Sequence, residues 1–145
     1  MMPAGYILIR PETLVALQKA VEAALGPAAA ECVAAGGRAG GGRATAAFRG
    51  AAHAQVEGLL AQGAAIGWGH FRLEHLTPTS LAVTVDGSPF ARAYGGARAP
   101  VCHLTRGVLE ALAARVLERP DRVSVSETAC AATGAARCRF ETVEA

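Results

Sequence analysis

The amino-acid sequence predicts an α+β fold in which helices pack on one antiparallel sheet. In the first part of the chain, apolar residues recur at the spacing of helices that are buried on one face. From about residue 65 the pattern changes to alternation, and the strands expected there follow one another in pairs. With 145 residues the chain is long enough to bury one core, so we expect a single domain over residues 1–145.

The N-terminal third is expected to be mainly helical. Residues 6–10 are a short β-prone run. A helix is predicted over residues 11–25, with proline in its first turn and Gly-Pro directly after it. Its apolar positions are Leu14, Leu17, Val21 and Leu25. A short helix over residues 28–35 follows, and we expect its Cys32 to pack in the core.

Residues 36–42 contain five glycines and are predicted to be a mobile connection or a lid over a pocket. A phosphate-binding loop is excluded, because the Lys-Ser/Thr ending of that motif and a preceding strand are both missing. A third helix is predicted over residues 44–62, with His53 at the edge of its buried face. That face consists of Phe48, Ala52, Val56, Leu59 and Leu60.

The rest of the chain supplies the strands. The expected elements are, in order, a strand over 66–73, a strand over 81–85, a short helix or extended edge over 90–94, a long helix from residue 102, and a final hairpin of 123–129 and 138–143. Strands joined in antiparallel pairs, with helices grouped apart from them, are typical of an α+β layer fold.

Three of the four cysteines and one glutamate lie where the long helix and the final hairpin can meet. Cys102 is expected in the first helical turn, where the positive helix end favours the thiolate that binds metals. Cys130 and Cys138 flank the hairpin loop, and Glu127 precedes them on the first strand. We interpret the four residues as a tetrahedral zinc site. Two alternatives stay open: three inert buried thiols, or a Cys130–Cys138 disulfide.

The same region carries a series of short motifs: Ser88-Pro-Phe90-Ala91, Pro100-Val-Cys102, Gly107, Val123-Ser-Val125-Ser-Glu127-Thr-Ala-Cys130, Gly134 and Cys138-Arg-Phe140. With them, residues 88–140 resemble the 4-vinyl-reductase domain family, small ligand-binding domains found alone or as sensors on transcriptional activators for aromatic compounds. The resemblance implies that Cys102, Glu127, Cys130 and Cys138 hold zinc. It also implies a fold similar to that of the aromatic sensors and of trafficking-complex subunits.

An apolar pocket between helices and sheet is the usual place for a small hydrophobic ligand, and the resemblance implies the same. The candidate ligand-binding residues are Phe48, His53, Trp68, Phe90 and Tyr94. For each of them a role in core packing is the alternative. His53 would donate a hydrogen bond to a phenol-like or carbonyl oxygen, and a dry pocket would strengthen it.

The motifs that would indicate catalysis are missing. The chain has no Gly-x-Ser-x-Gly elbow and no dinucleotide fingerprint. Four protein ligands would fill the coordination sphere of zinc, which indicates a structural ion. We therefore expect a non-catalytic sensor or carrier of a small hydrophobic or aromatic molecule. Two alternatives stay open: an accessory protein or reductase component acting on a vinyl tetrapyrrole in (bacterio)chlorophyll synthesis, as the family name implies, and a protein–protein scaffold.

Composition and charge limit the partners. The net charge is +2, and the arginines are scattered and not interleaved with aromatics, so we expect no nucleic acid. No run reaches the ~20 apolar residues of a membrane span, so we expect no membrane. The N-terminus does not resemble a signal peptide, which predicts a cytoplasmic protein with reduced thiols. The apolar helices make a homodimer plausible.

Overall fold

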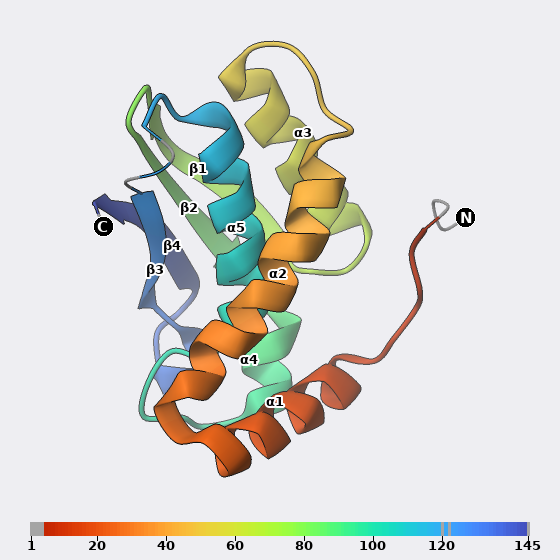
Figure 1. Ribbon diagram of the computed structural model, residues 1–145. Coiled ribbons are helices and arrows are strands. Elements are labelled where there is room, and N and C mark those ends of the chain that lie inside the picture. Colours follow the sequence, from red (N-terminus) through yellow and green to blue (C-terminus); the bar gives the residue numbers. More distant parts are fainter. Residues whose placement is uncertain (1–4, 120, 122, 145) are drawn as a thin grey trace.

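The computed structural model describes residues 5–119, 121 and 123–144 (Figure 1). The helices are α1 (Pro11–Leu25), α2 (Ala29–Thr45), α3 (Ala52–Ala65), α4 (Pro89–Tyr94) and α5 (His103–Val116). The strands are β1 (His70–Thr77), β2 (Ser80–Asp86), β3 (Val123–Ala129) and β4 (Cys138–Glu144). Two 3₁₀ turns, η1 (Gly26–Ala28) and η3 (Ala131–Thr133), connect them.

The four strands form one antiparallel sheet in the order β1-β2-β4-β3. The sheet therefore consists of two hairpins, β1–β2 and β3–β4, that meet along β2 and β4. Figure 1 shows α5 lying along one face of the sheet, with α2 and α3 beyond it and α1 and α4 at one end. The predicted α+β fold with helices packed on an antiparallel sheet is confirmed.

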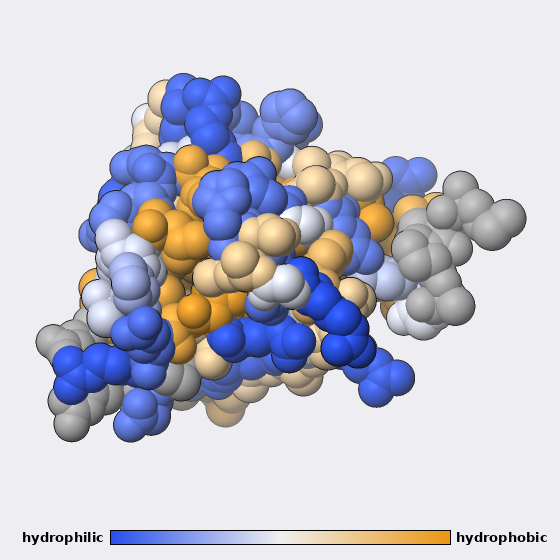
Figure 2. Space-filling model, turned by 90° about the horizontal axis from the view of Figure 1, so that it is seen from above, coloured by the Kyte–Doolittle hydropathy of each residue, from blue (hydrophilic) through white to orange (hydrophobic). Residues whose placement is uncertain are grey.

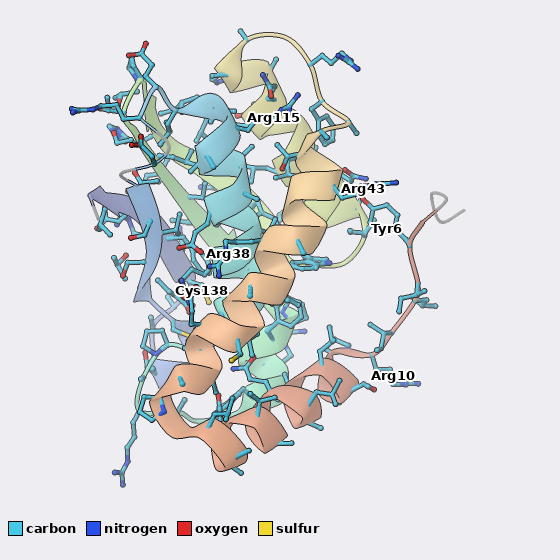
Figure 3. The ribbon with its side chains drawn as sticks, viewed as in Figure 1. Tyr6, Arg10, Arg38, Arg43, Arg115 and Cys138 are labelled. Atoms are coloured by element: carbon cyan, nitrogen blue, oxygen red, sulfur yellow. The ribbon has the colours of Figure 1, made fainter. Side chains whose placement is uncertain are left out.

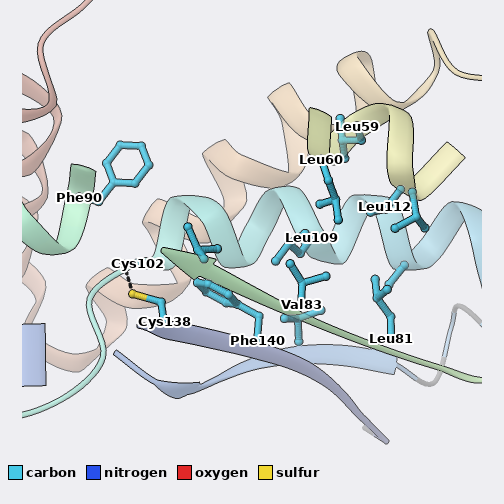
Figure 4. Packing of buried hydrophobic residues seen from close by; sticks show 14 of the residues in the cluster. Leu59, Leu60, Leu81, Val83, Phe90, Cys102, Leu109, Leu112, Cys138 and Phe140 are labelled. Atoms are coloured by element: carbon cyan, nitrogen blue, oxygen red, sulfur yellow. Dashed lines mark hydrogen bonds between the residues drawn. The ribbon is translucent and has the colours of Figure 1, made fainter. Parts of the chain in front are cut away.

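The core lies between this face of the sheet and the helices (Figure 4). Val83 pairs with Phe140 and Val85 pairs with Cys138, so all four side chains point to the same side. A register shift between Leu73 and His75 changes the phase of β1. This bulge explains why the inward apolar positions of β1 do not follow strict alternation.

The glycine-rich residues 36–42 lie in the middle of helix α2, so the prediction of a mobile connection was wrong. A Cβ atom on Gly37 would lie 2.2 Å from the carbonyl oxygen of Leu104, and one on Gly107 would lie 2.0 Å from that of Ala34. Glycine is needed at these positions because the backbones of α2 and α5 nearly touch. Close packing thus outweighs the roughly 1 kcal/mol per residue by which glycine weakens a helix.

Several predicted boundaries also differ from the structure. Residues 6–10 are extended but pair with no strand of the described chain. The predicted helix over 28–35 continues to Thr45, and α3 begins at Ala52 and not at residue 44. The first strand begins at His70, because residues 66–69 form a turn with Gly67 and Gly69 at positive φ. Cys32 is exposed on α2 and not in the core.

The surface is mixed in character. Seen from the end at which α5 finishes, hydrophilic residues surround smaller hydrophobic areas (Figure 2). Large apolar side chains are exposed on the N-terminal segment and on α1, with Ile7 at 80%, Leu8 at 89% and Leu17 at 60%. Within the described residues, no helix combines the length and the apolar character that crossing a membrane requires.

Candidate metal centre and apolar cavity

The structure brings the four predicted metal ligands together. Cys102 is the N-cap residue of α5, Glu127 lies on β3, Cys130 directly follows β3, and Cys138 begins β4. One ligand atom from each residue lies within 4.8 Å of the others, and all four residues are buried. The Sγ atoms of Cys102 and Cys138 are 3.9 Å apart (Figure 4). The four cysteines are free thiols in the structure, so the disulfide alternative is not adopted.

A β-bulge makes this convergence possible. In a regular strand, residues 127 and 130 would point to opposite faces of the sheet. Glu127 pairs with Phe140, but Ala129 pairs with Arg139, so one extra residue is inserted in β3 between them. The inserted residue reverses the alternation, and Cys130 therefore faces the same side as Glu127.

Hydrogen bonds from three segments hold the donor atoms in place. The backbone N–H of Cys102 donates to Glu127 Oε1 at 2.9 Å, and the N–H of Ala131 donates to Cys138 Sγ at 3.4 Å. The Ser88 hydroxyl lies 3.3 Å from Cys102 Sγ and also accepts the N–H of Ala91 at the start of α4. Such outer contacts orient metal ligands and tune their affinity.

The electrostatics of the cluster favour a bound cation. Hydrogen bonds with Cys130 and Cys138 raise the pKa of Cys102, while hydrogen bonds from Cys102 and Cys138 lower the pKa of Cys130. Burial raises the pKa of Glu127 to about 8, because the buried carboxylate is poorly solvated. Its Oε2 atom is buried without a hydrogen-bond partner. Three sulfurs, one carboxylate and an orphaned oxygen fit a tetrahedral zinc ion.

An apolar cavity of about 230 Å³ lies beside this centre, between α2, α3, α5 and β1. Trp68 and Phe71 form part of its wall, together with leucines of α3 and α5. Gly36 and Gly40 line it from α2, and a Cβ atom on Gly40 would meet nothing within 4 Å. The missing side chains of these two glycines therefore leave room in the cavity.

Of the five predicted ligand-binding residues, the structure brings only Trp68 to the wall of this cavity. The ring of Phe90 packs edge-on against Trp68 with a centroid distance of 5.0 Å, but Phe90 lies behind the wall. His53, Tyr94 and Phe48 also lie outside the lining, so the cavity does not support them as ligand-binding residues.

Each of these three side chains is occupied elsewhere. His53 lies on the exposed face of α3, and its side chain is 69% accessible. Tyr94 donates its hydroxyl hydrogen to a carboxylate of α1. Phe48 follows α2 and packs its ring against Gly58 of α3. Their helical or loop positions were compatible with a pocket, but the packing angle of α3 decides which face reaches the cavity.

Sequence reasoning missed two polar residues of the cavity. Gln62 near the end of α3 lines it, and so does Tyr6 of the extended N-terminal segment. Gln62 Nε2 donates to the Tyr6 hydroxyl at 2.9 Å. Figure 3 shows Tyr6 pointing from the N-terminal segment toward the helices. A polar glutamine beside an apolar helix face was the available signal for Gln62, whereas Tyr6 had none.

Comparison with known proteins agrees with this geometry. The family model of the 4-vinyl-reductase domain matches residues 81–144, which include β2, α4, α5, the final hairpin and all four candidate metal ligands. The chain carries a 4-vinyl-reductase domain. No curated protein sequence matches it significantly.

Two solved structures share the fold of this 4-vinyl-reductase-domain chain. The phenol-responsive sensory domain of the transcription activator PoxR, solved with phenol, superposes with a TM-score of 0.78 at 19% identity, over 96% of this chain and 76% of that one. A vinyl-4-reductase family protein from Methanocaldococcus jannaschii superposes with a TM-score of 0.65 at 13% identity, over 97% of this chain and 85% of that one. Both matches extend beyond residues 81–144 to the N-terminal helices.

Proposed function

We propose that residues 1–145 act as a single binding domain that takes up a small apolar or aromatic molecule and performs no chemistry on it, as a sensor or carrier. The observation that carries the proposal is the cavity of about 230 Å³, whose wall is almost entirely apolar. Small-molecule sites are typically such concave, largely apolar spaces with few polar groups. The phenol-bound sensory domain of the same fold supports a small aromatic ligand.

The size of the cavity favours a ligand of one or two rings. An apolar cavity of about 150 Å³ in another protein accepts benzene. The cavity of about 230 Å³ is larger, but it is small for the four linked pyrroles of a tetrapyrrole. We therefore favour a small aromatic molecule over the tetrapyrrole of the alternative hypothesis.

We assign the metal centre a structural role within this function. When bound, zinc would supply a fourfold link between the start of α5 and the final hairpin, held by Cys102, Glu127, Cys130 and Cys138. Helix α5 also contributes Leu104 and Thr105 to the cavity wall, only two and three residues after Cys102. Fixing the first turn of α5 would thus preorganise this wall for the ligand.

The proposal is tested by filling the cavity from α2. Gly40→Leu places a side chain in open space at the cavity wall, whereas Gly42→Leu places it on the outside of the same helix. Trp68 is the only tryptophan and lines the cavity, so its fluorescence should change when toluene or phenol binds. We expect binding by the wild-type chain and by Gly42→Leu, and at least a tenfold loss in Gly40→Leu. Equal binding by both variants would contradict this site.

A homodimer stays a prediction. The exposed apolar side chains of the N-terminal segment and α1 are compatible with it. Sedimentation of the purified chain at several concentrations would decide the oligomeric state.

A further inference from the structure

We infer that the ligand of the cavity is an uncharged molecule that carries a hydrogen-bond donor on an apolar body, and that Gln62 Oε1 accepts this hydrogen bond. Gln62 is thus the residue that determines specificity between donors and non-donors. The inference rests on the proposed function, because it names the chemical class that the same cavity selects.

The starting observation is an acceptor that has no partner. Gln62 Oε1 is buried and forms no hydrogen bond, although Gln62 lines the cavity. A buried acceptor without a partner costs about 1–3 kcal/mol, and native structures rarely leave one unpaired. Among the described residues, the other such side-chain atom is Glu127 Oε2 in the metal centre. Both orphaned oxygens therefore lie where a ligand is expected.

Tyr6 determines which end of the Gln62 amide is free. The Nε2 group of Gln62 donates to the Tyr6 hydroxyl at 2.9 Å, so the nitrogen already has a partner. The oxygen at the other end of the amide is left to accept from the cavity. Because the extended segment of Tyr6 lies over this side of the cavity, the same residue both orients the amide and contributes to the wall.

The rest of the lining excludes a charged ligand. No aspartate, glutamate, lysine, arginine or histidine of the described chain lines the cavity. A carboxylate or ammonium group would lose its hydration there without gaining a counter-charge. A neutral hydroxyl or N–H group needs one acceptor, and Gln62 Oε1 supplies one. The ligand class that follows is a small phenol, alcohol or neutral amine.

The experiment compares three one-ring probes with the wild-type chain and Gln62→Met. Phenol carries a donor, toluene has nearly the same shape without oxygen, and anisole has an oxygen that only accepts. Methionine keeps the length of glutamine but removes the amide. We expect Gln62→Met to raise the ratio of the phenol Kd to the toluene Kd about tenfold, the range of one buried hydrogen bond. The anisole-to-toluene ratio should stay the same.

Gln55→Met is the matched control, because Gln55 lies on the same helix outside the cavity and bonds to Gly50 and Arg115. It should leave both ratios unchanged. Should Gln62→Met fail to fold, Tyr6→Phe provides a second test. Loss of the hydroxyl lets the amide turn, so anisole binding should improve relative to toluene.

The outcomes separate the inference from the proposed function. An unchanged phenol-to-toluene ratio in Gln62→Met, with tight binding of both probes, would overturn the inference alone. A loss of anisole binding equal to that of phenol would also overturn it, since the amide nitrogen would then face the ligand. Failure of every probe to bind the wild-type chain would overturn the proposed function.

Discussion

The metal centre and the apolar cavity share helix α5 but are built from opposite materials. The centre takes Cys102 from the start of this helix and surrounds it with ionisable donor atoms. The cavity takes Leu104, Thr105 and Val108 from the next turns and faces them with glycines and leucines. Each region contains one buried oxygen without a partner, Glu127 Oε2 or Gln62 Oε1.

The surroundings of each orphaned oxygen indicate what completes it. Next to three sulfurs, Glu127 requires a cation, because protons alone leave crowded acidic groups out of water. In an apolar wall, Gln62 requires a neutral donor, because a charge there would lack a counter-charge. The comparison teaches that an unpaired buried atom indicates a site, whereas its neighbours indicate the ligand.

Loss of a metal ligand should have the largest effect. Cys138→Ser removes one of the four donors and leaves the other buried acids without a cation. For an ion present at a thousand times its Kd, the loss lowers the free energy of unfolding by about 4 kcal/mol. We expect the melting temperature to fall by roughly 10 °C. Metal analysis of the purified variant should show less than one zinc per chain.

Cys32→Ser is the matched control, because this thiol is exposed on α2 and far from the cluster in the chain. It should keep the zinc content and the melting temperature of the wild type. Unchanged zinc and stability in Cys138→Ser as well would contradict the metal centre and return the inert-thiol alternative.

Widening the contact between α2 and α5 should disturb the cavity and spare the metal. In Gly107→Ala the new methyl group would lie 2.0 Å from the carbonyl oxygen of Ala34, so the helices must separate. We expect a loss of about 1–3 kcal/mol in the free energy of unfolding and weaker toluene binding, with one zinc retained. Gly42→Ala, in open space on α2, should instead stabilise by up to about 1 kcal/mol. Similar denaturant midpoints for both variants would show that the helices are not in close contact.

The smallest effect is expected where α1 and α4 meet, outside both sites. The hydrogen bond to Glu22 raises the pKa of Tyr94 to about 12, above its ordinary value of 10.0. The folded state therefore holds this proton more tightly than the unfolded state. The resulting stability is complete below pH 10 and is lost as the pH rises toward about 12.

Tyr94→Phe lacks this proton and provides the comparison. Its melting temperature should fall less than that of the wild type over the same alkaline range, while zinc content and probe binding at neutral pH stay the same. Parallel curves for the two proteins would show that the bond to Glu22 does not contribute.

The sequence by itself determined the features that depend on local chemistry. Alternation in residues 123–129 and 138–143 predicted the final hairpin, and the cysteines at its loop with Cys102 after Pro100 predicted the metal cluster. These predictions succeeded because the donors are chemically distinctive and lie at element ends, which short-range patterns locate well. The β-bulge that turns Glu127 and Cys130 to one side was not predicted, since the extra residue is visible only in the pairing with β4.

Only the tertiary structure decided the cavity and the role of the glycines. Residues 36–42 lack apolar periodicity, so local preferences indicate a loop, yet packing on α5 makes them helix. In the same way, the angle at which α3 packs leaves His53 in water and turns Gln62 inward beside Tyr6, 56 residues away in the chain. A cavity is an absence of side chains between elements, and such a space depends on long-range packing that no local pattern records.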